Sequence, residues 1–436
     1  MHTLFVHPNS RPEYAAVADM AGIDPPIWIA LLAERESRKG KEVAVLDANA
    51  FNFSAKEAAW RIQAMRPRHV VFWADGQNPQ SSTTAMPFII DACKEVRAFD
   101  PDIILKVGGI HPTALPRRTF QETGARVIGP WPLDDLDTDL PGMAWDLLPM
   151  ELYKAHNWHA FGYESRRPYA AMYTGLGCPY GCYFCSIGAL YGKPALRRWS
   201  PEWVAERARE LSGWGVKHLK IADELFVFDE QRVKAVCEVL KPHGFNMWAY
   251  ARVDTITPEL LAALKAAGVN WLAYGFESSS QRVREGAGKR GSQKQTDDAI
   301  RWTREAGISV VANAIFGLPD DDLDTMRETL DWTIEQRFEW ANFNTCAAYP
   351  GSKLYEQANP KDLPDTWAGY SQLGYESKPL PTKHLSGAAV LSFRDAAFIE
   401  YYGNPGYQEM IQAKFGDGAL EEVRAMVGKP LPRRHQ

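Results

Sequence analysis

Short apolar runs alternate with amphipathic segments along the first 128 residues of the chain. A run of about four to eight apolar residues between turn residues is typical of a buried strand, and helically spaced apolar positions are typical of a helix that covers a sheet. The predicted strands are Thr3–Val6, Glu42–Asp47, His69–Trp73, Ile103–Val107 and Arg126–Ile128. The helices predicted between them are Pro26–Arg38, Ser54–Met65 and Thr83–Ala98. This order predicts a Rossmann-like parallel sheet, whose ligands bind at the carboxyl ends of its strands.

A second series of strands and helices occupies residues 169–358. Its predicted strands are Ala170–Thr174, His218–Ala222, Asn246–Tyr250, Trp271–Gly275, Ser309–Ile315 and Ala341–Thr345. Helices fall between them, for example at Pro201–Ser212 and Pro258–Ala267. Six such units predict a partial (β/α)6 barrel that is open on one side.

The segments on either side of this series have a different composition. Residues 129–168 are predicted to form a linker, because their first part is rich in Pro and Asp and has little periodicity. Residues 359–436 are predicted to form a small C-terminal helical domain, with amphipathic helices at Phe393–Tyr402, Gly406–Phe415 and Leu420–Val427. The predicted fold class is therefore α/β, with a Rossmann-like sheet in residues 1–128 followed by the barrel and the helices.

The bulk composition is that of a globular protein and narrows the function only slightly. The chain has 436 residues, 45% of them hydrophobic and 24% charged, which is too long for one typical domain. A formal net charge of -5 gives no support to nucleic-acid binding. No secretory signal is visible, and the apolar stretch Pro25–Ala33 is too short to span a bilayer. We therefore expect a cytoplasmic protein without a membrane span.

Three of the six cysteines form the strongest local signal in the sequence. Cys178, Cys182 and Cys185 have the spacing C-x3-C-x2-C, which arises by chance at about 1 in 5,000 for each cysteine. Structural zinc usually takes four protein ligands, and no further Cys or His follows at finger-like spacing. Three thiolates would instead leave one iron of a [4Fe–4S] cluster open for a cosubstrate. Zinc remains the alternative at this stage, and the scattered Cys93, Cys237 and Cys346 are predicted to be buried apolar residues.

The cysteine segment, with Phe184 as its aromatic residue, resembles the C-x3-C-x-aromatic-C signature of the radical S-adenosylmethionine (SAM) superfamily. The resemblance extends from about Tyr169 to Glu356. It implies a [4Fe–4S] cluster on Cys178, Cys182 and Cys185 that binds SAM at its open iron. It also implies reductive cleavage of SAM to a 5′-deoxyadenosyl radical.

Residues at the other strand ends match this family in order. Asp223 and Glu224 follow the second barrel strand, where the family has a group that holds the SAM ammonium. Which of the two carboxylates would do so is open. The alternative is that they form a helix cap or a solvated acidic turn. Arg252 follows the third strand and could bind the SAM carboxylate, or it could simply pair with Asp254. The resemblance also implies cofactor contacts for Phe184, Glu277, Ser278 and Asn313.

The N-terminal sheet resembles the cobalamin-binding domain of the cobalamin-dependent radical SAM subfamily. The residues that carry this resemblance lie at three places. Asp47 and Asn49 lie at the end of the second predicted strand, Ser81, Ser82 and Thr83 at the start of the third predicted helix, and Gly108 and Gly109 after the fourth predicted strand. Asn49 stands where cobalamin mutases have a cobalt-binding His, so the lower cobalt ligand is open, with His7 and His111 as candidates by residue type alone. The alternative for this domain is a nucleotide-binding or docking sheet, although it lacks G-x-G-x-x-G after strand one.

The resemblance implies methylation of an unactivated carbon of a small-molecule metabolite, with cobalamin as the methyl carrier. Such an enzyme needs an external one-electron reductant such as flavodoxin or ferredoxin. One alternative keeps the cofactors but catalyses cyclisation, ring contraction or oxidation without methyl transfer. Another is a non-catalytic cobalamin or Fe–S carrier.

Overall fold

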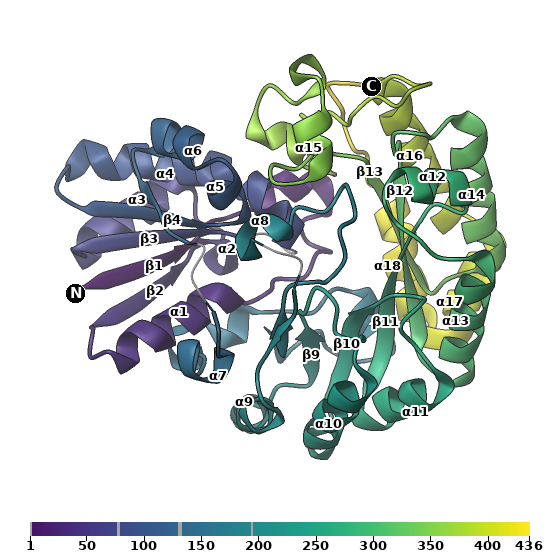
Figure 1. Ribbon diagram of the computed structural model, residues 1–436, viewed down its shortest axis with the longest axis horizontal. Coiled ribbons are helices and arrows are strands. Elements are labelled where there is room, and N and C mark those ends of the chain that lie inside the picture. Colours follow the sequence, from purple (N-terminus) through teal and green to yellow (C-terminus); the bar gives the residue numbers. More distant parts are fainter. Residues whose placement is uncertain (1, 76–78, 130–132, 193–194) are drawn as a thin grey trace.

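The computed structural model describes residues 2–75, 79–129, 133–192 and 195–436. Its N-terminal domain is a parallel sheet with the strand order β2-β1-β3-β4-β5 (Figure 1). The strands are β1 (Thr3–His7), β2 (Val43–Asp47), β3 (His69–Ala74), β4 (Ile104–Gly109) and β5 (Arg126–Val127). Helix α1 (Ile27–Arg38) covers one face, and α3 (Ala55–Met65), α4 (Met86–Phe99) and α6 (Pro116–Thr123) cover the other. The predicted Rossmann-like sheet is confirmed.

Alternate residues of the strands pack into two different cores. Phe5 and Val71 face α1, whereas Leu4 and Phe72 pack with residues of α3 and α4. Side chains of a strand alternate between its faces, so strands covered on both sides are apolar throughout. This explains why these strands are continuous apolar runs in the sequence.

Three helical segments differ from the sequence prediction at the carboxyl edge of this sheet. Short helices α2 (Ala48–Phe51) and α5 (Ile110–Ala114) follow β2 and β4 directly. A 3-10 segment, η2 (Pro79–Ala85), precedes α4, so the regular helix begins at Met86 and not at Thr83. The hydroxyl of Ser82 donates to the carbonyl of Ala74, which ties the first part of the expected helix to the end of β3.

The second half of the molecule is a six-stranded parallel sheet with the order β13-β12-β11-β10-β9-β6. Because consecutive strands are neighbours and β6 and β13 do not pair, the sheet forms the predicted partial barrel, open on one side (Figure 1). Its strands are β6 (Tyr169–Met172), β9 (His218–Ile221), β10 (Asn246–Ala251), β11 (Val269–Glu277), β12 (Ser309–Phe316) and β13 (Trp340–Thr345). The outer helices are α9 (Pro201–Gly213), α10 (Glu230–Leu240), α11 (Pro258–Ala267), α13 (Gln293–Glu305) and α14 (Leu323–Gln336).

Shorter elements connect these strands and helices near the carboxyl ends of the barrel strands. A two-residue ladder joins β7 (Gly175–Leu176) to β8 (Arg197–Arg198) in antiparallel orientation. The short helices are α8 (Gly188–Tyr191), α12 (Gln281–Gly286) and α15 (Lys353–Gln357). None of these short elements is visible in the hydrophobic pattern, because each has too few residues to show a period.

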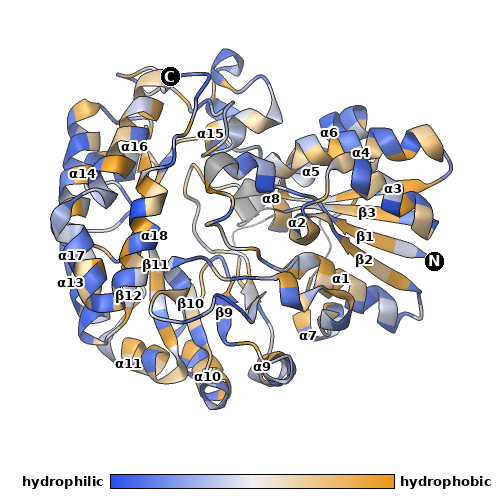
Figure 2. Ribbon diagram, turned by 180° about the vertical axis from the view of Figure 1, so that it is seen from behind, coloured by the Kyte–Doolittle hydropathy of each residue, from blue (hydrophilic) through white to orange (hydrophobic). Residues whose placement is uncertain are grey.

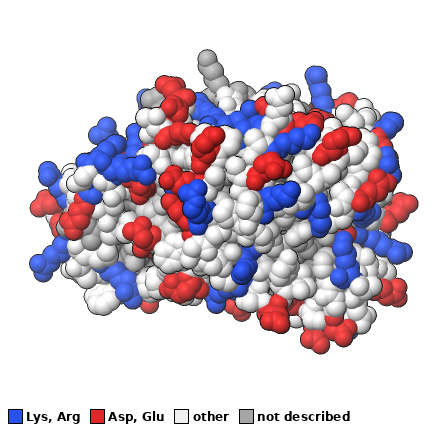
Figure 3. All heavy atoms as spheres, turned by 90° about the horizontal axis from the view of Figure 1, so that it is seen from below, with Lys and Arg blue, Asp and Glu red and all other residues white. Residues whose placement is uncertain are grey.

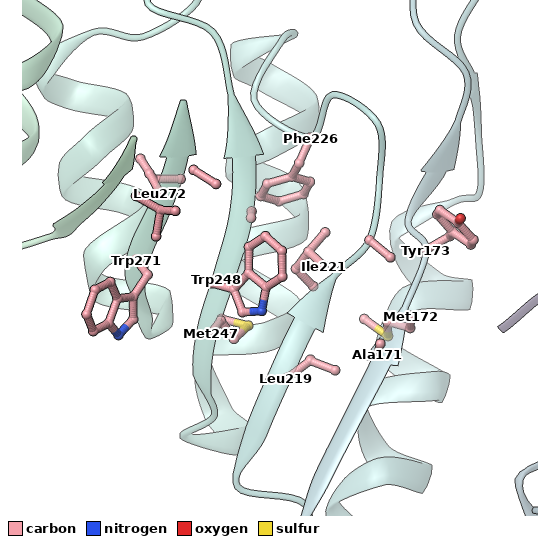
Figure 4. Packing of buried hydrophobic residues seen from close by; sticks show 14 of the residues in the cluster. Ala171, Met172, Tyr173, Leu219, Ile221, Phe226, Met247, Trp248, Trp271 and Leu272 are labelled. Atoms are coloured by element: carbon pink, nitrogen blue, oxygen red, sulfur yellow. The ribbon is translucent and has the colours of Figure 1, made fainter. Parts of the chain in front are cut away.

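Aromatic side chains form much of the barrel core. Figure 4 shows Trp248 and Trp271 on neighbouring strands, among apolar side chains such as Ile221 and Leu272. Trp158, from the segment predicted as a linker, lies edge-on to both indoles, with ring centroids 5.2 Å apart in each pair. Edge-to-face contacts of this kind add to the burial of the rings. Trp158 therefore belongs to the barrel core rather than to a free tether.

The described part of residues 129–168 is packed against both domains. It contains α7 (Leu136–Asp139) and the 3-10 turns η3 (Trp145–Leu147), η4 (Met150–Leu152) and η5 (Trp158–Ala160). Trp145 and Tyr153 are buried, and the Tyr153 hydroxyl donates to Oδ2 of Asp47 at 2.8 Å. Its Pro-rich composition indicated the lack of regular structure but not the burial.

The C-terminal helices α16 (Gly387–Tyr402), α17 (Pro405–Phe415) and α18 (Asp417–Val427) share the hydrophobic core of the barrel. Figure 2 shows apolar residues along the strands and on α16 and α18. Before these helices, η8 (Trp367–Tyr370) packs into the core of the N-terminal domain, where Trp367 Nε1 donates to Glu122 at 2.7 Å. The C-terminal region therefore contacts both halves of the molecule.

On the face drawn in Figure 3, Lys and Arg side chains are interspersed with Asp and Glu side chains. This mixture agrees with the small net charge of the sequence. Among the described residues, none of the helices combines the length and the apolar character that crossing a membrane requires.

A first prediction concerns Gly108, where a Cβ atom would lie 2.3 Å from Cζ3 of Trp73. Trp73 is buried and stacks on Trp28, so its indole has little room to move. Gly108→Ala should therefore destabilise the protein by about 1–3 kcal/mol, as overpacked cores do. Thermal unfolding followed by indole fluorescence measures the loss.

Gly213→Ala is the matched control, because a Cβ built at this position in α9 would have no atom within 4 Å beyond its chain neighbours and the adjacent backbone of its own helix. This substitution should be neutral or stabilising by about 0.4–1 kcal/mol, because Ala restricts the unfolded chain. A Gly108→Ala protein that unfolds at or above the temperature of the Gly213→Ala protein would contradict the packing argument.

Candidate active site

The three clustered cysteines follow β6 and line one pocket of about 290 Å³ at the carboxyl ends of the barrel strands. None of the three forms a disulfide, and each residue is partly exposed. In the described ranges, no group of three or more His, Cys, Asp or Glu side chains is arranged to hold a single metal ion. Three thiols around an open pocket suit a cluster with one iron free for a ligand better than a closed four-ligand zinc site. The residues present therefore fit the [4Fe–4S] cluster.

Burial raises the pKa of all three thiols, that of Cys185 to about 12. Buried thiolates need a positive partner, which iron supplies in a cluster. Cys346 also lies on the wall of this pocket, but it is fully buried and burial raises its pKa to about 12. Cys346 lies after β13 and not in the cysteine loop.

Two adjacent carboxylates after β9 hold the backbone of the cysteine loop. Asp223 accepts hydrogen bonds from the backbone N–H of Thr174 at 2.6 Å and from its hydroxyl at 2.7 Å. Glu224 accepts from the N–H of Gly177 at 2.7 Å, one residue before Cys178. Gly177 has a φ of +89°, and a Cβ there would lie 2.3 Å from the carbonyl oxygen of Ala195. The loop is therefore held from β9 and requires glycine at this position.

The geometry separates the roles of these two carboxylates. Glu224 lines the pocket with the cysteines, whereas Asp223 lines a small space behind the loop, next to Arg232. Burial raises the pKa of Glu224 to about 8 and that of Asp223 to about 6. No Lys or Arg among the described residues forms an ion pair with Glu224. Glu224 is therefore the one of the pair that can receive a cationic ligand group.

Arg252 lines the same pocket, and it also makes the ion pair that was the alternative interpretation of its position. Its guanidinium forms two hydrogen bonds of 2.9 Å with the carboxylate of Asp254. It also lies 3.8 Å above the ring of Tyr180, in the cysteine loop. The guanidinium is thus fixed beside the cluster pocket, with a face against the loop.

The remaining predicted cofactor contacts divide into two groups. Phe184, Glu277 and Asn313 line the cluster pocket. Ser278 does not line it, because its side chain turns away and shares a hydrogen bond of 3.1 Å with Thr329. Asn313 donates to the carbonyl of Tyr274 at 3.0 Å, so its amide is oriented by the barrel itself.

The predicted cobalamin contacts at the edge of the N-terminal sheet are engaged with one another or with nearby elements. Asp47 accepts from His7, Ala50 and Tyr153, and Asn49 accepts from the backbone N–H of Ser10 at 3.3 Å. Ser82 accepts from the N–H of His111, and Thr83 shares a hydrogen bond of 3.1 Å with the His111 ring. The side chain of Ser81 lies outside the described residues. Contact of these residues with cobalamin stays a prediction.

Gly108 and Gly109 have structural reasons to be glycine that do not depend on a ligand. Gly108 faces Trp73, and Gly109 has a φ of +120°, with the carbonyl oxygen of Ala74 only 2.4 Å from where a Cβ atom would lie. Bulky residues at either position would disturb β3 and β4 directly. A loss of cobalamin binding in such variants would therefore not by itself show contact with the cofactor.

The two candidate cobalt ligands are both buried. His7 bonds to Asp47 at 2.8 Å; burial works to lower its pKa, but Asp47 outweighs this and the pKa of His7 is raised. Burial lowers the pKa of His111 to about 3. The Nε2 atom of His111 is enclosed without a hydrogen-bond partner, and the residue lines neither large cavity. Neither His7 nor His111 is therefore assigned as the lower cobalt ligand.

A second cavity of about 790 Å³ lies between the domains and extends into the barrel. Tyr14 and Thr84 contribute from the N-terminal domain, and Lys220 and Trp248 contribute from the barrel strands. This cavity shares wall residues with the cluster pocket: Tyr250, Asn313, Asn344, Tyr349 and Gln372. Its size and its position between the N-terminal domain and the cluster pocket fit a small molecule that must lie beside the cluster pocket.

Sequence reasoning missed several residues that line these cavities, above all Lys289 and Gln372. Lys289 lies in a loop 12 residues after Glu277 and bonds to it, which no spacing rule indicates. Gln372 lies in the C-terminal region and donates to the carbonyl of Thr345 at 3.0 Å. Only the fold brings these residues to the site.

Both domains of this chain match protein families that bind the cofactors predicted from the sequence. Residues 172–333 match the model of the radical SAM superfamily, and residues 14–131 match the B12 binding domain. An uncharacterized methyltransferase of Pyrococcus horikoshii is 25% identical over 93% of both chains. An anaerobic magnesium-protoporphyrin IX monomethyl ester cyclase of Cereibacter sphaeroides is 23% identical over 90% of this chain and 68% of its own.

Among solved structures, the radical SAM methyltransferase TsrM from Kitasatospora setae, with cobalamin and a [4Fe–4S] cluster bound, is similar to this chain. Its TM-score is 0.67 at 15% sequence identity, and the match covers 98% of this chain and 100% of that one. At this identity the likeness shows a common fold. With both domain models matched in the expected order, the chain belongs to the cobalamin-dependent radical SAM family.

Proposed function

We propose that this protein methylates an unactivated carbon of a small molecule, as a cobalamin-dependent radical SAM methyltransferase. The observation that carries the proposal is the junction of the cluster pocket with the larger interdomain cavity. Tyr250, Asn313 and Asn344 belong to the walls of both, so the two spaces adjoin at these residues. A substrate in the larger cavity can therefore meet SAM on one side and the carboxyl edge of the N-terminal sheet on the other.

The cofactors of the family are a [4Fe–4S] cluster, SAM and cobalamin. When bound, the cluster and SAM supply a 5′-deoxyadenosyl radical, and cobalamin supplies a methyl group for transfer to carbon. Glu224 has no cation partner among the described residues and is the residue we assign to the SAM ammonium. Arg252 is assigned to the SAM carboxylate and Glu277 to the ribose, because both side chains line the same pocket.

The larger cavity has the dimensions and lining of a small-molecule site. Its volume of about 790 Å³ is within the range of ligand pockets, and aromatic side chains form much of its wall. Among the charged groups on its wall, Lys220 and Arg394 are paired with Asp24 and Asp395 respectively, each at 2.7 Å, and Glu13 and Lys429 also line it. Paired charges favour a substrate that is largely uncharged where it contacts them.

An external electron donor completes the proposal, because reductive cleavage of SAM consumes an electron that the cluster must receive from another molecule. We propose a small carrier such as flavodoxin or ferredoxin. The exposed residues Pro179 and Gly181 bring the cysteine loop to the surface, which allows such a protein to approach the cluster.

The similarity to the magnesium-protoporphyrin cyclase supports a second candidate function. That relative is named as a cyclase and matches 90% of this chain. A reaction without net methyl transfer would use the same pocket and the same SAM contacts. The similarity to a methyltransferase over 93% of both chains favours methylation.

The second prediction concerns the cluster. Anaerobically reconstituted protein should bind about four irons, and Cys182→Ala should not retain a stable cluster, because two thiolates remain. Iron analysis and the visible absorption spectrum measure this. Cys237→Ala is the control, because Cys237 is buried in α10, away from the pocket, and should retain the iron. Stoichiometric zinc without an iron chromophore would contradict the assignment.

The third prediction separates Asp223 from Glu224. Glu224→Gln should weaken SAM binding by about 10- to 100-fold at normal iron content, because it removes a charge-assisted hydrogen bond to the ammonium. Asp223→Asn should mainly reduce iron loading, because Asp223 supports the loop through Thr174. Anaerobic titration with SAM and iron analysis distinguish them. The reverse pattern would move the ammonium contact to Asp223.

The fourth prediction tests the reaction. With reductant, cobalamin and a pool of candidate metabolites, the enzyme should form both 5′-deoxyadenosine and S-adenosylhomocysteine from methyl-deuterated SAM, and the label should enter one product. Omitting cobalamin should abolish S-adenosylhomocysteine. Formation of 5′-deoxyadenosine alone would favour the second candidate, and the absence of both products would indicate a carrier without catalysis.

A further inference from the structure

Among the described residues, Arg252 and Lys289 are the cationic side chains that line the cluster pocket. Lys289 forms an ion pair with Glu277, a predicted SAM-binding residue. Its ammonium donates to Oε1 of Glu277 and to the carbonyl oxygen of Gly275, both at 2.5 Å. Both side chains of the pair are largely buried, with exposed fractions of 12% for Lys289 and 8% for Glu277. The ammonium thus bridges the side chain and the backbone at the end of β11.

The hydrogen bonds of Lys289 connect Gly275 and Glu277 across a segment of unusual backbone conformation. Glu277 has a φ of +64°, which is rare for a residue other than glycine, and the register of β11 shifts between Gly275 and Glu277. A Cβ at Gly275 would lie 2.3 Å from Oε1 of Glu277 and 2.6 Å from Nζ of Lys289. The space for the ion pair therefore exists only because residue 275 is glycine.

The loop that carries Lys289 also contacts the cysteine loop. The N–H of Tyr183, which follows Cys182, donates to the carbonyl of Ala287 at 3.0 Å. Gly288, with a φ of +71°, packs so closely on the Tyr183 ring that a Cβ there would lie 2.7 Å from it. The N–H of Lys289 donates to the carbonyl of Arg284 at 2.9 Å, which fixes the loop on α12.

We propose that Lys289 is a positioning residue for SAM: it holds the Glu277 carboxylate in the cluster pocket and couples it to the cysteine loop. The inference rests on the proposed location of SAM in this pocket. Lys289 acts through Glu277, because its ammonium donates hydrogen bonds to Glu277 and to the carbonyl of Gly275. The loop that carries Lys289 is in turn hydrogen-bonded to the cysteine loop, through Ala287 and Tyr183. The cluster ligands and the ribose-binding carboxylate are then set at a fixed separation.

The test is anaerobic titration of cluster-loaded protein with SAM, without substrate, so that it does not depend on methyl transfer. Lys289→Met should lower SAM affinity on the order of tenfold at normal iron content, because Glu277 loses its partner. Lys289→Arg, which keeps the charge, should recover most of the affinity. Lys353→Met is the matched control: Lys353 lies 3.6 Å from the centre of the Tyr183 ring but does not line the pocket, and its loss should leave the affinity unchanged.

A double variant separates positioning from direct contact. If Lys289 acts through Glu277, Lys289→Met should have little further effect in a Glu277→Gln background. An equal loss of SAM affinity in both backgrounds would overturn the proposal, and so would an unchanged affinity in the single Lys289→Met variant. A failure of the methylation assay would leave this result standing, because the titration measures SAM binding alone.

Discussion

The cysteine loop can present three thiols to one cluster only if other parts of the chain hold its shape. The loop has no long regular element of its own, so its backbone N–H groups need partners from elsewhere. Asp223 and Glu224, after β9, accept hydrogen bonds from the loop before its first cysteine. Within the loop, the backbone of Tyr183 forms hydrogen bonds with the backbones of Ala287 and Leu354. The arrangement of the thiols therefore depends on the barrel strands being in register.

The same strand ends also form the walls of the SAM pocket. Glu224 both accepts the Gly177 N–H and opens to the pocket, so one carboxylate links the loop to the ligand space. At β11 the left-handed conformation of Glu277 and its pairing with Lys289 turn a second carboxylate toward that space. Backbone strain at a ligand pocket persists when the surrounding structure enforces it, and here Gly275 and the ion pair do so.

The two domains are joined by buried polar and aromatic contacts. Asp24 accepts from Lys220 at 2.7 Å and from Tyr169 at 2.6 Å; burial works to raise the pKa of Asp24, but Lys220 outweighs it and the pKa is lowered. Trp28 of the N-terminal domain stacks on Trp73 and meets the edge of Tyr173 at the end of β6. Removing one partner of a buried ion pair leaves an uncompensated charge, so the pair fixes how the domains face each other across the large cavity.

The sequence by itself determined the two α/β series, the partial barrel and the cysteine motif, because strand periodicity and ligand spacing are local properties. It also indicated the strand ends at which Asp223, Glu224, Arg252 and Glu277 stand, since the carboxyl ends of parallel strands meet at one edge. It did not indicate that the segment after residue 128 is packed into both domains, because its Pro-rich composition describes the backbone and not its neighbours.

Only the tertiary structure decided which side chains face the pocket. Asp223 and Glu224 are adjacent in the chain, yet one supports the loop from behind and the other opens to the cavity. Ser278, directly after the end of β11, turns toward Thr329, although Glu277 next to it lines the pocket. Lys289 reaches Glu277 from a separate loop. Such contacts depend on register, strain and loop packing, which arise only when distant parts of the chain meet.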